Sequence, residues 1–102
     1  MVVLEFSMFP LDKGVSLSPY VAKSLEVIES SGLPYECHAM GTLIEGEIDE
    51  VLAVVRQCFD TMAAHADRIE CTIKMDYRRG RTEGLKTKVA SVEAQLGHKL
   101  NK

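Results

Sequence analysis

The sequence predicts an α+β fold, in which an antiparallel four-stranded sheet carries two helices on one face and a further helix follows at the C-terminus. Three observations predict it: segments in which apolar and polar residues alternate, segments with apolar residues at helical spacing, and the order in which the two kinds of segment follow one another. With 102 residues, of which 46% are hydrophobic and 26% charged, the chain has the size and composition of a single globular domain covering 1–102.

Residues 2–9, VVLEFSMF, are apolar and rich in β-forming residues, and they predict the first strand. Successive side chains of a strand point to opposite faces, so the segment divides into two sets. One face carries Val2, Leu4, Phe6 and Met8, and the other carries Val3, Glu5, Ser7 and Phe9. Pro10 and Gly14 then indicate a turn.

A helix is predicted to begin near SLSPY, with Ser16 or Ser18 as its N-cap and Pro19 in its first turn, where a missing N–H costs nothing. Gly32 is the expected left-handed residue after the helix, and Pro34 prevents its continuation. The apolar stripe expected to be buried consists of Val21, Leu25 and Ile28.

The segments YECHA (35–39) and TLIEG (42–46) predict a hairpin of two antiparallel strands. If Met40 and Gly41 form a two-residue loop, Ala39 faces Thr42, Cys37 faces Ile44, and Glu36 lies opposite Glu45. The main alternative is one long bent strand over 35–45, which would leave a sheet of three strands.

The second helix is the clearest element, with acidic residues in its first turn. Its helical stripe comprises Ile48, Val51, Leu52, Val55, Cys58, Phe59 and Met62. The segment RIECTIKMDY (68–77) predicts the last strand, with Ile69, Cys71, Ile73, Met75 and Tyr77 on one face and Glu70, Thr72, Lys74 and Asp76 on the other. In the final helix, Leu85, Val89, Val92 and Leu96 form a narrow seam suited to packing on a partner.

The predicted order is therefore β-α-β-β-α-β plus a C-terminal helix, which is the ferredoxin-like arrangement. Two helices cover only one face of such a sheet. The opposite face mixes apolar and polar groups, as an interface between subunits does, so we expect a homo-oligomer. That face would carry Val3, Glu5, Ser7, Phe9, His38, Leu43, Thr72 and Lys74.

Charge and cysteine content limit the classes of function. A net charge of −3 and a pI near 5.6 give no general attraction to nucleic acid or to an anionic membrane, and no apolar run is long enough to span a bilayer. The N-terminus lacks the basic segment of a signal peptide. Cys37, Cys58 and Cys71 are odd in number and lie among apolar residues, so we expect free, buried thiols and a cytoplasmic protein.

Three segments at matching separations, SGLPYE (31–36), MGTLIEG (40–46) and KMDYR (74–78), resemble the thiamine-binding protein family of the MTH1187/YkoF type, and the resemblance extends over essentially the whole chain. It implies a ferredoxin-like fold, sheet-mediated dimers that pair into a homotetramer, and binding of thiamine (vitamin B1) or its hydroxymethylpyrimidine part without turnover. Many members carry proline where this chain has Ala39, which leaves the turn less rigid here.

Thr42 is the strongest candidate for a ligand contact, because the predicted register points its hydroxyl to the helix-covered side, where it needs a partner. For an arbitrary threonine, a bond to nearby backbone would be the better interpretation. The resemblance favours a bond to the aminopyrimidine ring. Glu45 could accept from the exocyclic amine of the ligand or face its thiazolium charge, or it could be an exposed edge charge.

Aromatic and sulfur-containing side chains could line a flat pocket for a heteroaromatic ring. The candidates are Phe6, Tyr20, Met40 and Phe59, with Ser7 as a further one. For Phe6 and Phe59, each taken alone, a place in the core is the better interpretation. Tyr20 is the better candidate of the aromatic residues, because it carries a polar tip at the start of a helix.

Other chemistry finds less support. Cys37 and His38 are neighbours on a strand and point to opposite faces, so they cannot easily share a metal, and we expect no metal site and no cofactor. The loop Arg78-Arg79-Gly80-Arg81 could bind an anion but is more simply a solvated loop. No nucleophile–base pair can be named, so we expect no enzyme. The alternative function is an ACT-like oligomeric module that senses another metabolite or holds a protein partner.

Overall fold

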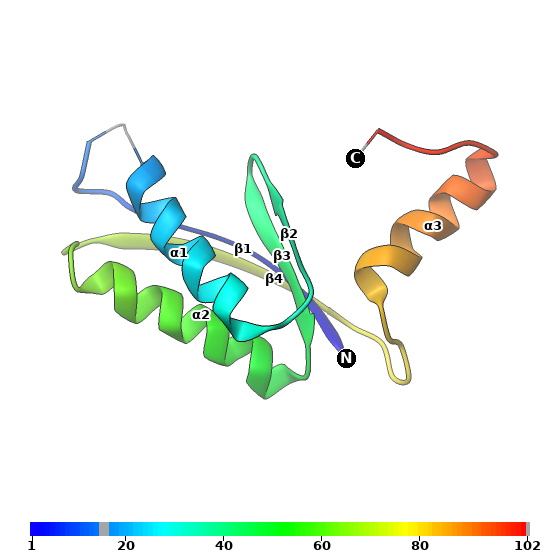
Figure 1. The fold of residues 1–102 in the computed structure, drawn as a ribbon, viewed down its shortest axis with the longest axis horizontal. Helices are drawn as coiled ribbons and strands as arrows, with labels where there is room; N and C mark the ends of the chain where they lie inside the picture. The colour runs from blue at the N-terminus through cyan, green and yellow to red at the C-terminus, as the bar shows by residue number, and fades with distance from the viewer. Residues whose placement is uncertain (15–16, 102) are drawn as a thin grey trace.

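The structure, a computed structural model, describes residues 1–14 and 17–101. This part of the chain forms four strands and three helices in the predicted order (Figure 1). They are β1 (Val2–Pro10), α1 (Ser18–Ser31), β2 (Tyr35–His38), β3 (Gly41–Gly46), α2 (Ile48–Ala63), β4 (Ile69–Tyr77) and α3 (Gly84–Leu96). The strands form one antiparallel sheet in the order β2-β3-β1-β4, which confirms the ferredoxin-like fold and excludes the three-stranded alternative.

The sheet places its apolar side chains against α1 and α2, which lie side by side on one face (Figure 1). Leu4 pairs with Ile44 of β3, and both are fully buried. The predicted core face of β1 is confirmed, since all four of its residues belong to the buried cluster. The rest of that cluster is Ile28, Ile44, Val51, Val54, Val55, Cys58 and Met62.

The ends of the helices agree only in part with the predicted caps. Gly32 has a φ of 75° and follows α1, and its N–H donates to the Glu29 carbonyl, as expected of a left-handed terminating residue. The N-cap of α1 is Leu17, so Ser18 is wrong as a cap and is instead the first residue of the helix. Ser16 lies outside the described residues. At α2, the Glu47 N–H donates to the Glu50 side chain 2.9 Å away, closing a capping box.

Several residues expected to be buried are exposed. On α1 this holds for Val21, and on α2 for Ile48, Leu52 and Phe59, each between 41% and 45% exposed. α2 buries its stripe between the sheet and α1, so side chains on its other flank remain uncovered. Of the three cysteines only Cys58 is buried, because Cys37 lies near a strand end and Cys71 on an edge strand.

The hairpin register is also different from the predicted one. His38 pairs with Gly41 and Cys37 with Thr42, so the loop is Ala39–Met40 and the expected pairing of Glu36 with Glu45 is wrong. A side chain at Gly41 would meet the Phe6 carbonyl oxygen at 3.1 Å. Gly41 is therefore part of β3, where the absence of a side chain lets β1 pack closely, and it is not a residue of the turn. The parity of the pairing is unchanged, so each side chain keeps its predicted face.

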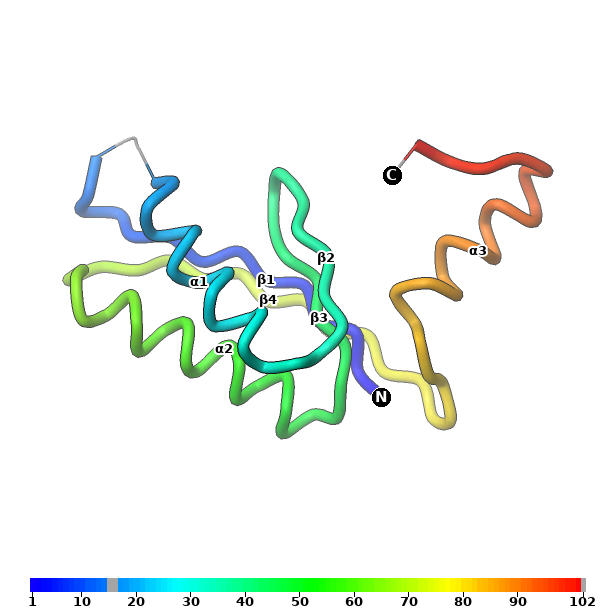
Figure 2. The backbone as a smooth tube through the Cα atoms, in the orientation of Figure 1, coloured from blue at the N-terminus to red at the C-terminus, as the bar shows by residue number. Residues whose placement is uncertain are grey.

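The third helix leaves the body of the molecule. Its first turn contacts β1 and β3 on the face opposite α1 and α2, and the rest projects away (Figures 1 and 2). Of its predicted seam, Leu85 is buried and Val89 is half-buried, whereas Val92 and Leu96 are each 50% exposed. The face expected to be free is thus covered at one end, where Val3 is buried.

Candidate functional site

A groove lies between α1, the second half of β1 and the tip of the β2–β3 hairpin. Its volume is about 540 Å³, within the range of small-molecule sites in proteins. Strand β1 supplies Phe6 to Phe9, and the hairpin supplies Cys37 to Thr42. Helix α1 and the residue before it supply Leu17, Ser18, Val21, Ala22, Ser24, Leu25 and Ile28.

The groove has an apolar floor and a few hydroxyl groups. Phe6 and Ile28 belong to the buried core, and Met40 at the hairpin tip is 88% exposed. Thr42 pairs with Phe6 across the β1–β3 ladder, so its half-buried side chain stands beside the ring on the helix-covered side, as predicted. Within 1–14 and 17–101 no side-chain hydrogen bond engages its hydroxyl.

The lining is nearly free of charge. None of its described residues is Asp, Glu, Lys or Arg, and its ionisable side chains are Cys37 and His38. The described lining therefore supplies no counter-ion for a charged ligand group, and such a group would have to stay in contact with solvent at the mouth of the groove. A flat, uncharged ring with a few hydrogen-bonding groups matches the groove better.

Four of the six residues predicted as a ligand site meet in this groove: Phe6, Ser7, Met40 and Thr42. Ser7 lies at its edge, since its position in β1 turns the side chain to the opposite face of the sheet from Phe6. Phe59 does not reach the groove and lies exposed on α2. Tyr20 lines a separate small cleft with Lys23, Thr61 and His65, between α1 and α2.

Glu45 lies on the other face of the sheet from Thr42 and away from the groove. Its side chain is 2% exposed and accepts a 2.5 Å hydrogen bond from the Gly84 N–H at the start of α3. Glu83, the N-cap of α3, has a φ of 55° and supplies no side-chain cap. The carboxylate of Glu45 therefore caps the helix in its place, and its charge faces the positive end of the helix dipole.

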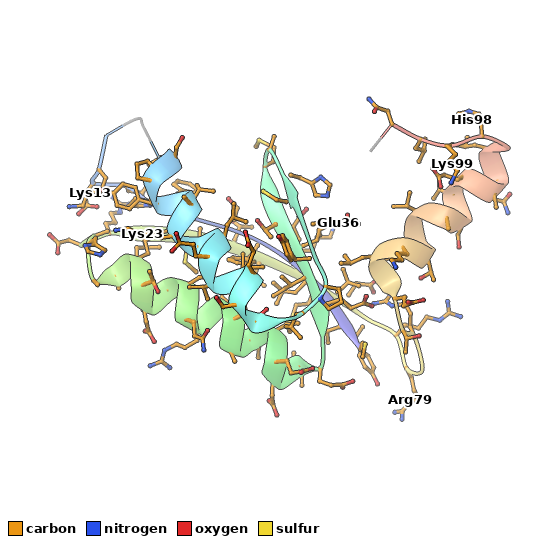
Figure 3. The ribbon with its side chains drawn as sticks, viewed as in Figure 1. Lys13, Lys23, Glu36, Arg79, His98 and Lys99 are labelled. Carbon is orange, nitrogen blue, oxygen red and sulfur yellow. The ribbon has the colours of Figure 1, made fainter. Side chains whose placement is uncertain are left out.

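The basic loop before α3 is held by Asp76 of β4. Arg81 donates to the Asp76 carboxylate at 2.9 Å and to the Asp76 carbonyl at 2.8 Å, and Lys88 also bonds to this carboxylate. These hydrogen bonds, with Lys88 first, lower the pKa of Asp76 to about 2. Arg81 thus anchors the loop, whereas Arg79 points outward at its tip (Figure 3).

Sequence reasoning missed the contribution of α1 to the groove. Val21 was assigned to the core, yet it lines the groove with Leu25, while Ser24 is buried between the helices. Ser24 packs against Cys58 of α2, whose thiol donates to the Ser24 carbonyl oxygen 3.7 Å away, and no pattern in the sequence links these two distant residues.

The titratable side chains among the described residues of the groove lining are Cys37 and His38. Burial raises the pKa of the Cys58 thiol to about 11, so this cysteine is a neutral core residue. Within 1–14 and 17–101, no group of three or more His, Cys, Asp or Glu side chains is placed to hold a metal ion.

Comparisons with known proteins agree on one family. A model of the family described as thiamine-binding proteins matches residues 4–93. A UPF0045 protein of Mycobacterium bovis is 41% identical over 96 residues, covering 93% of this chain and 94% of that protein. A UPF0045 protein of Methanocaldococcus jannaschii is 36% identical over 91 residues, covering 89% of this chain and 91% of that protein.

Two solved structures show the same fold. The crystal structure of the Methanocaldococcus jannaschii protein matches with a TM-score of 0.83 at 36% identity, covering 89% of this chain and 94% of that one. A Thermotoga maritima protein, named provisionally as a thiamine biosynthesis or salvage protein, matches with a TM-score of 0.76 at 25% identity, covering 89% of this chain and 97% of that one. In the part of the chain that the structure describes, no helix is long and apolar enough to cross a membrane.

Proposed function

The chain belongs to the thiamine-binding protein family, and on that premise we propose that it binds thiamine or its hydroxymethylpyrimidine moiety in the groove between α1 and the β2–β3 hairpin. The pyrimidine ring would lie over Phe6 and beneath Met40, and the Thr42 hydroxyl would bond to a ring nitrogen or to the exocyclic amine. The role would be transport, storage or sensing of the vitamin, not its conversion.

The observation that carries this proposal is the position of Thr42. Its hydroxyl stands beside an aromatic ring at the wall of an uncharged groove of about 540 Å³ and is engaged by no described side chain. A partly buried hydroxyl of this kind gains from a ligand that completes its hydrogen bonding. Glu45 has its own partner in α3, so we assign no ligand contact to it.

Titration calorimetry with thiamine, hydroxymethylpyrimidine and thiamine phosphate tests the proposal. We expect saturable binding of the first two and weaker binding of the phosphate, because the described groove lining offers no cation. Absence of heat and of any thermal stabilisation with all three ligands at millimolar concentration would refute it.

The same protein should leave thiamine chemically unchanged. Prolonged incubation followed by chromatography would return the intact ligand, whereas appearance of a cleaved or phosphorylated product would make the protein an enzyme. The cysteines Cys37, Cys58 and Cys71 are free, which supports a reducing compartment such as the cytoplasm.

We also propose a homo-oligomer, with a dimer of dimers as its complete form. The apolar surface of α3 supports this, since Val92 and Leu96 are half exposed on a helix that projects from the body. The face of the sheet opposite α1 and α2 forms a broad depression with α3, and Glu36 of β2 is one of the residues that line it (Figure 3). This depression is a second surface that another subunit could cover. Sedimentation analysis would show a species larger than the monomer of 11.3 kDa, and a monomer at every concentration would contradict the assembly.

A further inference from the structure

Strand β1 has a neighbouring strand on both sides for only part of its length. Strand β4 pairs with it over Val2–Pro10, whereas β3 pairs with it only over residues 2–6, and the hairpin tip then turns away (Figure 2). Among the described strands, none pairs with the second half of β1 on that side. The groove reaches this gap in the sheet, because its lining includes residues 7–9. The backbone at the open edge of β1 therefore borders the groove.

The direction of the backbone groups at this gap follows from the ladder between β3 and β1. In an antiparallel ladder, alternate residues direct both N–H and C=O to the same neighbouring strand. The Glu45 N–H donates to the Pro34 carbonyl at 3.0 Å, on the β2 side of β3. Thr42, three positions away, therefore directs its backbone groups to the β1 side, where its partner is Phe6. Phe6 in turn directs its N–H and C=O to β3, and its carbonyl oxygen lies 3.1 Å from the place where a side chain at Gly41 would begin.

Met8 directs its backbone groups into the gap. It lies two positions beyond Phe6, so it shares the orientation of Phe6. A hydrogen bond at the end of the strand agrees, since the Leu11 N–H donates to the Arg68 carbonyl at 2.9 Å, on the β4 side. Odd-numbered residues of β1 thus face β4, and even-numbered residues beyond Phe6 face the gap. Pro10 is the next even-numbered residue, and its lack of an N–H removes no ladder bond there.

The Met8 backbone offers a donor and an acceptor that the described chain leaves unpaired. Met8 is 8% exposed, and within 1–14 and 17–101 no hydrogen bond engages its N–H or its C=O. Buried backbone groups are paired in nearly all native structures, because leaving one unpaired costs about as much as losing a hydrogen bond. Since both groups face the groove, one bound molecule can pair them together.

We propose that the Met8 N–H and C=O recognise the amidine edge of an aminopyrimidine, which is a ring nitrogen beside an exocyclic amine. The N–H donates to the ring nitrogen, and the amine donates to the Met8 carbonyl. Thr42 lies opposite Phe6, roughly 7 Å along β1 from Met8, so its hydroxyl is left to bond to the second ring nitrogen. The inference rests on the proposed function, because it uses the same groove. It adds that the ligand is selected by its pattern of donor and acceptor and not by ring shape alone.

A matched pair of ligands tests this recognition. In the oxo analogue of hydroxymethylpyrimidine, an oxo group replaces the amine and the neighbouring ring nitrogen carries a proton. Its edge then presents a donor to the Met8 N–H and an acceptor to the Met8 carbonyl, so both contacts become repulsive. Calorimetry should give a dissociation constant for the oxo analogue roughly a hundredfold higher than for hydroxymethylpyrimidine. Equal constants would overturn the inference.

Removal of the Met8 N–H alone is the second test. Cys37 allows a synthetic peptide of residues 1–36 to be ligated to residues 37–102, which gives the full chain without a substitution. In the ester variant, the α-hydroxy analogue of methionine at position 8 replaces the N–H by oxygen and keeps the side chain. This ester should weaken the binding of hydroxymethylpyrimidine roughly tenfold, because one hydrogen bond to the ligand is lost.

The matched control is the same ester at position 5. Glu5 is odd-numbered, so its N–H faces β4, where its partner is Lys74, and it is not among the described residues of the groove lining. The control should lose more stability than the position-8 ester and keep its affinity. Unchanged affinity of the position-8 ester, or equal weakening in both variants, would overturn the role of Met8 while hydroxymethylpyrimidine still binds. Absence of binding to the unmodified protein would overturn both this inference and the proposed function.

Discussion

Thr42 and Glu45 stand three positions apart on β3 and have opposite surroundings. Thr42 points to the helix-covered side and reaches the edge of an open groove, where no described side chain bonds to its hydroxyl. Glu45 points to the other side and is 2% exposed, with its carboxylate held by the Gly84 N–H. Both are polar residues in an apolar strand, and both were candidates for ligand binding before the structure was considered, with Thr42 the stronger of the two.

The two residues differ in where the hydrogen-bond partner of the side chain comes from. A buried polar group must be hydrogen-bonded to persist in a fold. The chain itself meets this need for Glu45 by placing the start of α3 against it, and the carboxylate serves to dock a helix. The Thr42 hydroxyl has no such partner among the described side chains and lies at the groove, so a bound molecule can form the hydrogen bond with it. Substitutions that remove each side chain should therefore affect different properties.

Glu45→Ala should have the largest effect, and on stability. The change leaves the Gly84 N–H buried without an acceptor and opens a small cavity, which together cost about 3 kcal/mol of unfolding free energy. Urea denaturation followed by circular dichroism measures it. Glu45→Gln is the matched control, since its amide oxygen can still accept the hydrogen bond, and it should lose much less. Equal losses in the two variants would show that the hydrogen bond is not what docks α3.

Gly84→Ala should disturb the same contact from the side of the helix. An added methyl group would lie 2.7 Å from the Val3 side chain and 3.0 Å from the Glu45 carboxylate, so α3 must move. Overpacking of this kind costs about 2 kcal/mol. The control is Gly97→Ala at the far end of α3, which meets no atom within 4 Å but has a φ of 80° and reports the backbone cost alone. A smaller loss for Gly84→Ala than for Gly97→Ala would contradict the tight packing.

Thr42→Val should leave stability nearly unchanged and weaken the ligand about tenfold, because the shape is kept and one hydrogen bond to the ligand is lost. Calorimetry with hydroxymethylpyrimidine gives the affinity, and thermal unfolding checks the fold. Thr61→Val is the control, since Thr61 is also half-buried but lines the small cleft between the helices. Full affinity in Thr42→Val would move the site away from β3.

The order of elements and the faces of the strands could be predicted, because both follow from local periodicity. Val2, Leu4, Phe6 and Met8 alternate with polar residues, and this alternation alone assigns them to the core. Which residues of the hairpin face the helices also follows from the local alternation, so Thr42 was placed on the correct side of the sheet. These properties need no knowledge of distant parts of the chain.

The hairpin register and the partner of Glu45 could not be predicted, because each depends on a distant segment. Gly41 was interpreted as a turn residue, yet a side chain at this position would crowd the Phe6 carbonyl oxygen of β1. Glu45 was interpreted as facing Glu36, yet it meets Gly84, which is 39 residues away.

Asp76→Asn should have the smallest effect, a slight loss of stability at neutral pH that disappears on acidification. Bonds from Lys88 and Arg81 hold the folded-state pKa of Asp76 at about 2, below its ordinary value of 3.8. The charged form therefore stabilises the fold fully above the ordinary value, and this contribution is lost as the pH falls from 3.8 through about 2. Because Asp76 is partly exposed, the effect is small and should shrink with added salt. Unfolding free energies measured from neutral pH to about pH 2 should show the two proteins converging on acidification. A constant difference between them at every pH would mean that Asp76 anchors the α3 loop through its shape and not its charge.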